Sequence, residues 1–154
     1  MRVNRLARWL GIVFSSALLL GCPPEQELAL YNNTGGDLYV RVGGDLVPWK
    51  NGEAIRFGGD DGLDWKKLSW EVGDDGVRDP QLIVEWDGER AVYRLAVPGL
   101  TEPFLDRSAG LYRRALQMQP DRKLYAVHVG AELPVEKPPA QPEGLPLAAR
   151  SSGG

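Results

Sequence analysis

Short runs in which apolar and polar residues alternate are the feature that most constrains how this chain folds. In residues 38–42, for example, Leu38, Val40 and Val42 fall on one face of an extended chain. A period of two is typical of a β-strand with one buried face, because successive side chains point to opposite sides. The other candidate strands are residues 28–30, 46–49, 54–57, 68–72, 82–86, 91–97 and 125–129.

Turn sequences separate these runs. The chain holds 19 glycines and 12 prolines, about a fifth of its residues, against a usual share of roughly 12%. Asn and Gly tolerate the backbone angles that tight turns need. The turn sequences predict three hairpins, which join residues 28–30 to 38–42, residues 46–49 to 54–57 around Asn51-Gly52, and the strands on either side of Asp87-Gly88.

Residues 105–119 carry two competing patterns. Leu111, Ala115 and Met118 have helical spacing, whereas Tyr112, Leu116 and Met118 fit one face of a strand. We favour a strand over residues 111–119, followed by a turn at residues 119–122 and a return strand, and a helix remains the alternative.

Seven or eight short strands separated by turns are typical of antiparallel sandwiches and small barrels. We therefore predict an all-β fold for residues 28–132, a small antiparallel β-sandwich of immunoglobulin-like or transthyretin-like architecture. Beyond it, residues 133–154 are rich in proline and end in small polar residues. This composition predicts an extended, mostly disordered tail.

The first 21 residues have the layout of a secretory signal peptide. Arg2, Arg5 and Arg8 precede an apolar run at residues 9–20. That run is shorter than the roughly 20 residues that a membrane-spanning helix needs, and it matches the length of a signal-peptide core helix.

The signal ends in Leu19-Leu20-Gly21-Cys22, which resembles the lipobox of bacterial lipoproteins. The resemblance implies cleavage before Cys22 and thioether attachment of diacylglycerol to its sulfur, with residues 22–27 as a lipidated tether. Two or more acyl chains anchor a protein stably to membrane lipid. An ordinary signal peptide with an incidental cysteine is the alternative. Because Pro23 follows the cysteine, we favour the outer membrane, facing the periplasm, over the inner membrane.

The charge of the chain argues against nucleic acid as a partner. Removing Arg2, Arg5 and Arg8 with the signal takes the formal net charge from -3 to -6. Phosphate binding needs a basic patch, and Arg113-Arg114 is only a pair.

Catalytic and metal-binding motifs are weak. His128 is the only histidine, and neither Ser69 nor Ser108 lies in a nucleophile-elbow sequence. One histidine and one cysteine leave too few ligands for a usual zinc site. We therefore expect no catalytic residue, no metal and no cofactor.

Two acidic turns could be mistaken for calcium sites. Residues 58–64 contain Asp60, Asp61 and Asp64, and residues 73–76 contain Asp74 and Asp75. The first approaches the Gly-Gly-x-Gly-x-Asp repeat of calcium-binding β-rolls, but the third glycine is replaced and the motif is not repeated. Asp-Gly pairs also favour turns on their own, so we predict solvated turns and little effect of calcium.

Four tryptophans follow the signal. Trp70 and Trp86 lie within alternating strands and are predicted to pack in the core. Trp49 and Trp65 lie beside turns, where an exposed aromatic ring could stack on a sugar or anchor a partner. Together these features predict a lipid-anchored, non-enzymatic binding or structural module of the cell envelope, whose partner is an envelope protein or glycan. A small hydrolase acting on envelope polymers is the alternative.

Overall fold

The computed structural model describes residues 25–72, 76, 78–97 and 100–150. The predicted signal peptide, Cys22, Asp74 and Asp75 lie outside these residues. Within the described part, no helix is long and apolar enough to cross a membrane. The elements are β1 (Glu25–Asn32), β2 (Leu38–Val42), β3 (Asp45–Trp49), β4 (Ala54–Phe57), the 3-10 helix η1 (Trp65–Lys67), β5 (Ser69–Val72), β6 (Arg78–Trp86), β7 (Glu89–Arg94), the 3-10 helix η2 (Ser108–Gly110), β8 (Leu111–Met118) and β9 (Leu124–Val127).

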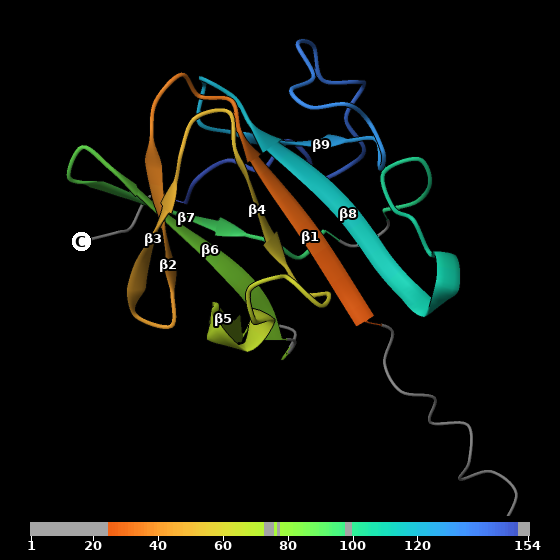
Figure 1. Cartoon of the computed structure of the whole chain (residues 1–154), viewed down its shortest axis with the longest axis horizontal. Helices are drawn as coiled ribbons and strands as arrows, with labels where there is room; N and C mark the ends of the chain where they lie inside the picture. The colour runs from red at the N-terminus through yellow and green to blue at the C-terminus, as the bar shows by residue number, and fades with distance from the viewer. Residues whose placement is uncertain (1–24, 73–75, 77, 98–99, 151–154) are drawn as a thin grey trace, which may run out of the picture.

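The strands form two sheets that pack face to face (Figure 1). Sheet A has the order β4-β1-β8-β9, and sheet B has the order β3-β2-β6-β5, with β7 paired to β6. Every strand pair is antiparallel except β1 and β8, which run parallel. The all-β sandwich is therefore confirmed, with one parallel pair where a fully antiparallel arrangement was expected.

The core forms because the predicted alternation points one side of each strand between the sheets. Leu30 of β1 and Leu116 of β8 meet Leu82 of β6 and Tyr93 of β7 there, and each is at most 1% exposed. The strand interpretation of residues 111–119 is confirmed, because β8 covers Leu111–Met118 and pairs along its whole length with β1. The helical alternative is wrong.

Two of the three predicted hairpins are wrong. β1 and β2 belong to different sheets, and so do β3 and β4, so both turn sequences are crossings between sheets. The buried side chain of Asn32 stabilises both crossings, since its Nδ2 donates to the carbonyl oxygens of Gly36 at 2.9 Å and of Trp49 at 2.8 Å. The hairpin at Asp87-Gly88 is confirmed, and Gly43-Gly44 forms another between β2 and β3.

The C-terminal segment was predicted to be extended and mostly disordered, but residues 133–150 form bends and a turn that pack against the sandwich. The backbone of Leu147 exchanges two hydrogen bonds with Leu124 of β9, at 2.8 and 3.0 Å. The Gln141 side chain binds the N–H and the C=O of Ala126 at 2.8 and 3.0 Å. Prolines exclude helix without preventing side chains from packing, and Leu145 and Leu147 pack against the core. The folded domain therefore continues to residue 150.

Candidate functional site

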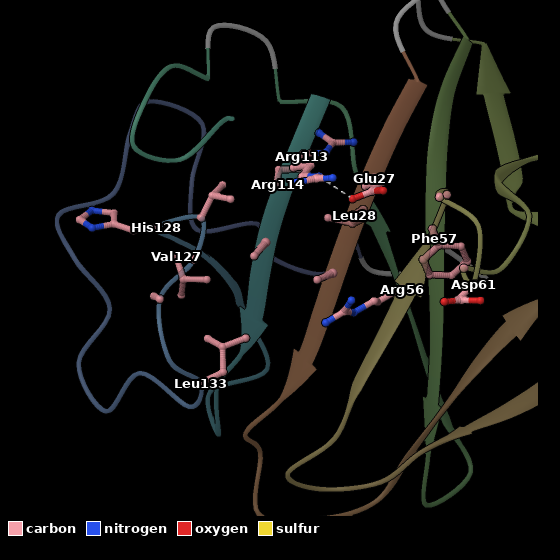
Figure 2. A pocket seen from close by; sticks show the side chains of 18 of the residues that line it. Glu27, Leu28, Arg56, Phe57, Asp61, Arg113, Arg114, Val127, His128 and Leu133 are labelled. Atoms are coloured by element: carbon pink, nitrogen blue, oxygen red, sulfur yellow. Dashed lines mark hydrogen bonds and ion pairs between the residues drawn. The ribbon is translucent and has the colours of Figure 1, made fainter. Parts of the chain in front are cut away.

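A groove of about 550 Å³ lies on the outer face of sheet A (Figure 2). Its floor crosses three strands and includes Ala29 of β1, Ala115 of β8 and Val127 of β9, which are neighbours in register. These side chains point outward because their neighbours along each strand point into the core. Two adjacent alanines leave a hollow where longer side chains would fill the surface.

One wall of the groove is the tight loop that follows β4. Within it the N–H of Gly58 donates to the carbonyl of Leu63 at 3.0 Å, and the N–H of Leu63 donates to the carbonyl of Arg56 at 2.8 Å. Gly58 has a φ of 78°, and a Cβ there would lie 1.9 Å from the carbonyl oxygen of Gln26. Only glycine fits this position, so the loop is held close against β1.

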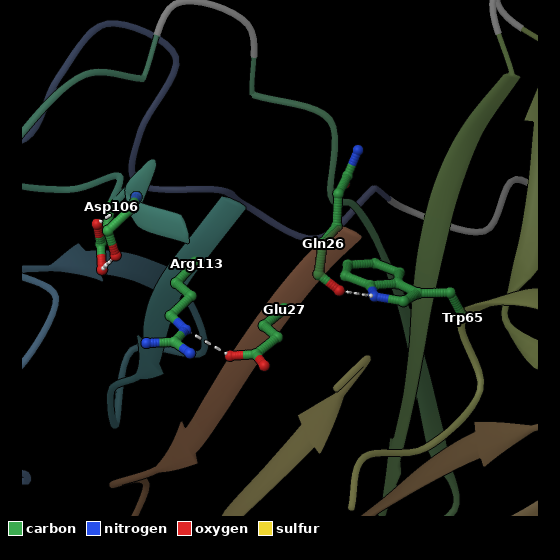
Figure 3. A network of polar contacts seen from close by, with 6 residues as sticks. Gln26, Glu27, Trp65, Asp106 and Arg113 are labelled. Atoms are coloured by element: carbon green, nitrogen blue, oxygen red, sulfur yellow. Dashed lines mark hydrogen bonds and ion pairs between the residues drawn. The ribbon is translucent and has the colours of Figure 1, made fainter. Parts of the chain in front are cut away.

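Charged side chains of both signs surround the floor. Arg113 donates to Glu27 at 2.9 Å (Figure 3), and Arg56, Asp60 and Asp61 line the same groove. In the described part of the chain, Arg56 forms no ion pair. The groove therefore offers a free cation and two carboxylates around a small apolar floor.

Arg114 supports the groove from beneath. Its Nη1 donates to the carbonyl of Leu95 at 2.9 Å, and its guanidinium lies 5.8 Å from the centre of the Trp65 ring. Burial lowers the pKa of Arg114. The Trp65 Nε1 in turn donates to the carbonyl of Gln26 at 2.8 Å, as Figure 3 shows. These contacts tie the start of β1 to both sheets.

The opposite wall is the segment after β9, which contains His128. The prediction placed His128 within the last strand, but β9 ends at Val127 and His128 is exposed. Its ring meets the edge of Phe104 at a centroid distance of 5.0 Å. Figure 2 shows that the imidazole lies away from Glu27 and Asp61 on the other side of the groove.

The structure does not bring the predicted catalytic candidates together. Ser69 and Ser108 lie outside the groove, and the Ser108 N–H and hydroxyl donate to Asp106 at 2.8 and 3.0 Å. These bonds hold the pKa of Asp106 below its usual value.

The acidic turn at residues 58–64 divides its aspartates between two roles. Asp60 and Asp61 line the groove, while Asp64 accepts a hydrogen bond of 2.9 Å from the N–H of Lys66 and caps η1. Among the described residues, no three His, Cys, Asp or Glu side chains gather in a metal-binding arrangement. The small effect of calcium remains a prediction.

The expected roles of two tryptophans are reversed. Trp49 is the central core tryptophan at 1% exposure, and its Nε1 donates to the carbonyl of Glu53 at 3.1 Å. Trp70 is 39% exposed, because β5 lies at the margin of sheet B. Trp65 packs against Phe57 at 5.8 Å, and Trp86 is half-buried against the core.

Sequence reasoning missed the groove itself. The sequence feature that could have predicted the groove is an alanine at an outward position in each of two strands. This feature predicts a groove only when β1 and β8 are known to be neighbours. Comparison with known proteins adds no identity, since no family model, no curated protein and no solved structure matches this chain.

Proposed function

We propose that this protein is a lipid-anchored lipoprotein of the cell envelope whose groove on sheet A binds an extended polypeptide segment of an envelope protein. Anchoring is supported by the sequence Leu19-Leu20-Gly21-Cys22 after a short apolar run. Membrane lipid is the first partner through the acylated Cys22. The outer membrane, facing the periplasm, is the favoured location.

A polypeptide ligand is favoured because sheet A already holds extended backbone by side-chain amides. Two residues beyond Ala115 on β8, the Gln117 amide donates to the carbonyl of Val135 at 2.8 Å and accepts from its N–H at 2.9 Å. On β9, the backbone N–H of Ala126 donates to the side-chain amide of Gln141, and this amide donates to the carbonyl of Ala126. The small alanine side chains of the floor would let a second backbone approach the sheet as closely as Val135 does. This feature of the groove is the main support for a polypeptide ligand.

Glycan binding is less well supported, because sugar rings usually stack on exposed aromatic faces. Phe57 is the aromatic residue of the groove lining, and it is fully buried. The mixed charges of Arg56, Asp60 and Asp61 suit a peptide that carries charges of both signs.

We propose binding without catalysis. Among the described residues, the lining holds no Ser, Thr, Cys, Lys or Tyr, and His128 lies across the groove from Glu27 and Asp61, so no nucleophile and base stand side by side as covalent catalysis requires. Glu27, one of the carboxylates, is paired with Arg113.

Mass spectrometry of the mature protein tests anchoring. We expect Cys22 to be the first residue and to carry the mass of acyl chains, and we expect Cys22→Ser to abolish both acylation and cleavage before residue 22. An unmodified Cys22 in the membrane-extracted protein would contradict the proposal.

Photo-crosslinking in cells tests the groove. A benzophenone amino acid at Ala131, an exposed residue on the wall of the groove, should give one discrete, protease-sensitive adduct. The same amino acid at Tyr39, which is exposed on sheet B, serves as the matched control and should give none. A missing adduct at Ala131, or an adduct that resists protease and yields to glycan hydrolases, would overturn the polypeptide ligand.

A further inference from the structure

The chain leaves very little length between the lipidation site and the folded domain. Cys22 precedes Glu25, the first residue of β1, by three residues. Their Cα atoms therefore lie at most about 11 Å apart, whereas the polar zone of one leaflet is roughly 5–8 Å deep. We propose that the end of the sandwich where β1 begins is a membrane-contact surface that lies against the phospholipid headgroups. This inference rests on the proposed lipidation of Cys22.

Several elements share this end of the sandwich. β8 begins beside β1, because the two strands are parallel and Glu25 pairs with Leu111. β6 begins and β7 ends there too, since the N–H of Leu95 donates to the carbonyl of Pro80 and Arg114 of β8 binds the Leu95 carbonyl, both at 2.9 Å. The starts of β1, β6 and β8 all lie at the lower side of Figure 1.

This end exposes an aromatic and apolar group of side chains on β5. Val72 pairs with Arg78 at the start of β6, and it is 62% exposed, while Trp70 is 39% exposed. The Arg78 guanidinium lies 5.7 Å from the centre of the Trp70 ring. Tryptophan and arginine suit the membrane interface, because each joins an apolar body to a polar tip.

A second aromatic–cation pair lies near the start of β8. The Arg107 guanidinium is 5.5 Å from the centre of the Tyr112 ring. Both residues border a hollow of about 200 Å³, which Leu105 also lines. Each sheet therefore places one arginine–aromatic pair at this end, and both pairs suit the membrane interface.

Arg78 and Arg107 provide the polar tips of these two pairs, and a guanidinium near a lipid phosphate is attracted to it. The sequence also carries Asp74 and Asp75 between β5 and β6. The aromatic–cation pairs and the short tether, and not the net charge of this end, therefore support the contact.

Spin labels on the full-length lipoprotein test the contact in vesicles of phosphatidylethanolamine and phosphatidylglycerol. One label replaces Val72, and the matched control replaces Glu89, which is exposed at the far end of β6 and β7. We expect the Val72→Cys label to be severalfold more accessible to oxygen than to a water-soluble nickel complex, and the Glu89→Cys label to show the reverse. Trp70→Ala should reduce the oxygen accessibility at position 72 severalfold.

Mass spectrometry of the same samples separates the two proposals. An acylated Cys22 leaves the introduced cysteine as the only thiol that takes a label. If Cys22 is acylated and the label at position 72 is as accessible to the nickel complex as the label at position 89, the membrane-contact surface is overturned while anchoring stands. Two labelled thiols per chain would overturn both proposals.

Discussion

The outer faces of the two sheets carry different kinds of side chain. On sheet A, Ala29 and Ala115 lie side by side, and the chain's own residues 133–135 pass over the neighbouring part of the face. On sheet B, Arg41 pairs with Glu85 at 2.7 Å, and the outward-facing Ile83 of β6 is only 5% exposed. The outer face of sheet B is therefore filled around Ile83, whereas the outer face of sheet A has a hollow over Ala29 and Ala115.

The hollow lies on the face of one sheet and not in a cleft between domains. Both faces follow the same alternation, so the difference lies in the size of the outward side chains and not in the fold. Where those side chains are small, backbone can approach the sheet, and Gln117 already uses this approach to hold Val135.

Deleting residues 133–154 should have the largest effect, because this segment bonds to β8 and β9 of sheet A and also reaches sheet B, where Arg150 contacts Val92 and Glu71. The deletion removes the hydrogen bonds to Leu124, Ala126 and Gln117, each contributing about 1 kcal/mol. It also exposes apolar surface beneath Leu145 and Leu147. We expect a loss of about 6 kcal/mol or more in the free energy of unfolding, measured by urea denaturation. An unchanged midpoint would show that the segment is disordered after all.

Gln117→Ala should cost about 2 kcal/mol, because it leaves the N–H and C=O of the half-buried Val135 without their partner and removes the buried Gln117 side chain. The matched change on sheet B is Gln81→Ala, whose side chain bonds to the exposed Glu71. That change should stay within about 0.5 kcal/mol. Equal losses in the free energy of unfolding for the two variants would show that the two faces do not differ in this way.

Tyr93 connects the two sheets and should give a smaller effect that depends on pH. Its hydroxyl donates to the carbonyl of Arg122 at 2.7 Å, and burial raises its pKa from 10.0 to about 12. Between these values the unfolded state releases the proton first, so stability falls as pH rises from about 10 to about 12. Tyr93→Phe should lose about 1 kcal/mol at neutral pH and show a shallower decline above pH 10. An identical alkaline decline in both proteins would contradict this role.

The exposed ion pairs should matter least for stability. Arg41→Ala on sheet B and Arg113→Ala on sheet A should each cost about 0.5 kcal/mol or less, since both pairs are open to solvent. They should differ in binding, because only Arg113 borders the groove. Comparing the adduct yield of a crosslinker at Ala131 in the two variants checks this, and a greater loss of yield with Arg41→Ala would count against the assignment.

The alternation of side chains predicted where the strands lie, but it did not predict which strands pair. Residues 33–37 look like a hairpin turn, yet Asn32 stabilises a crossing to the other sheet through contacts with Gly36 and Trp49. Periodicity describes one strand at a time, whereas pairing depends on contacts between residues far apart in sequence. The groove was missed for the same reason, because its alanines come from β1 and β8.

Composition was also a poor guide at the margins of the domain. Repeated prolines predicted disorder after residue 133, but Leu147 pairs with Leu124 and Gln141 binds Ala126. Trp70 has the alternation of a core residue and is exposed, since β5 extends to the margin of its sheet. Burial at such positions is decided by what the opposite sheet covers, which the local sequence does not contain.

If the proposed partner binds in the hollow on sheet A, filling this hollow should abolish binding. A photo-crosslinker at Ala131, an exposed residue that lines the groove, would report the partner in cells that carry Ala115→Trp or, as the matched control, Tyr39→Trp. We expect the adduct to disappear with Ala115→Trp and to persist with Tyr39→Trp, at equal protein levels. An adduct that persists when the floor is filled would contradict the account.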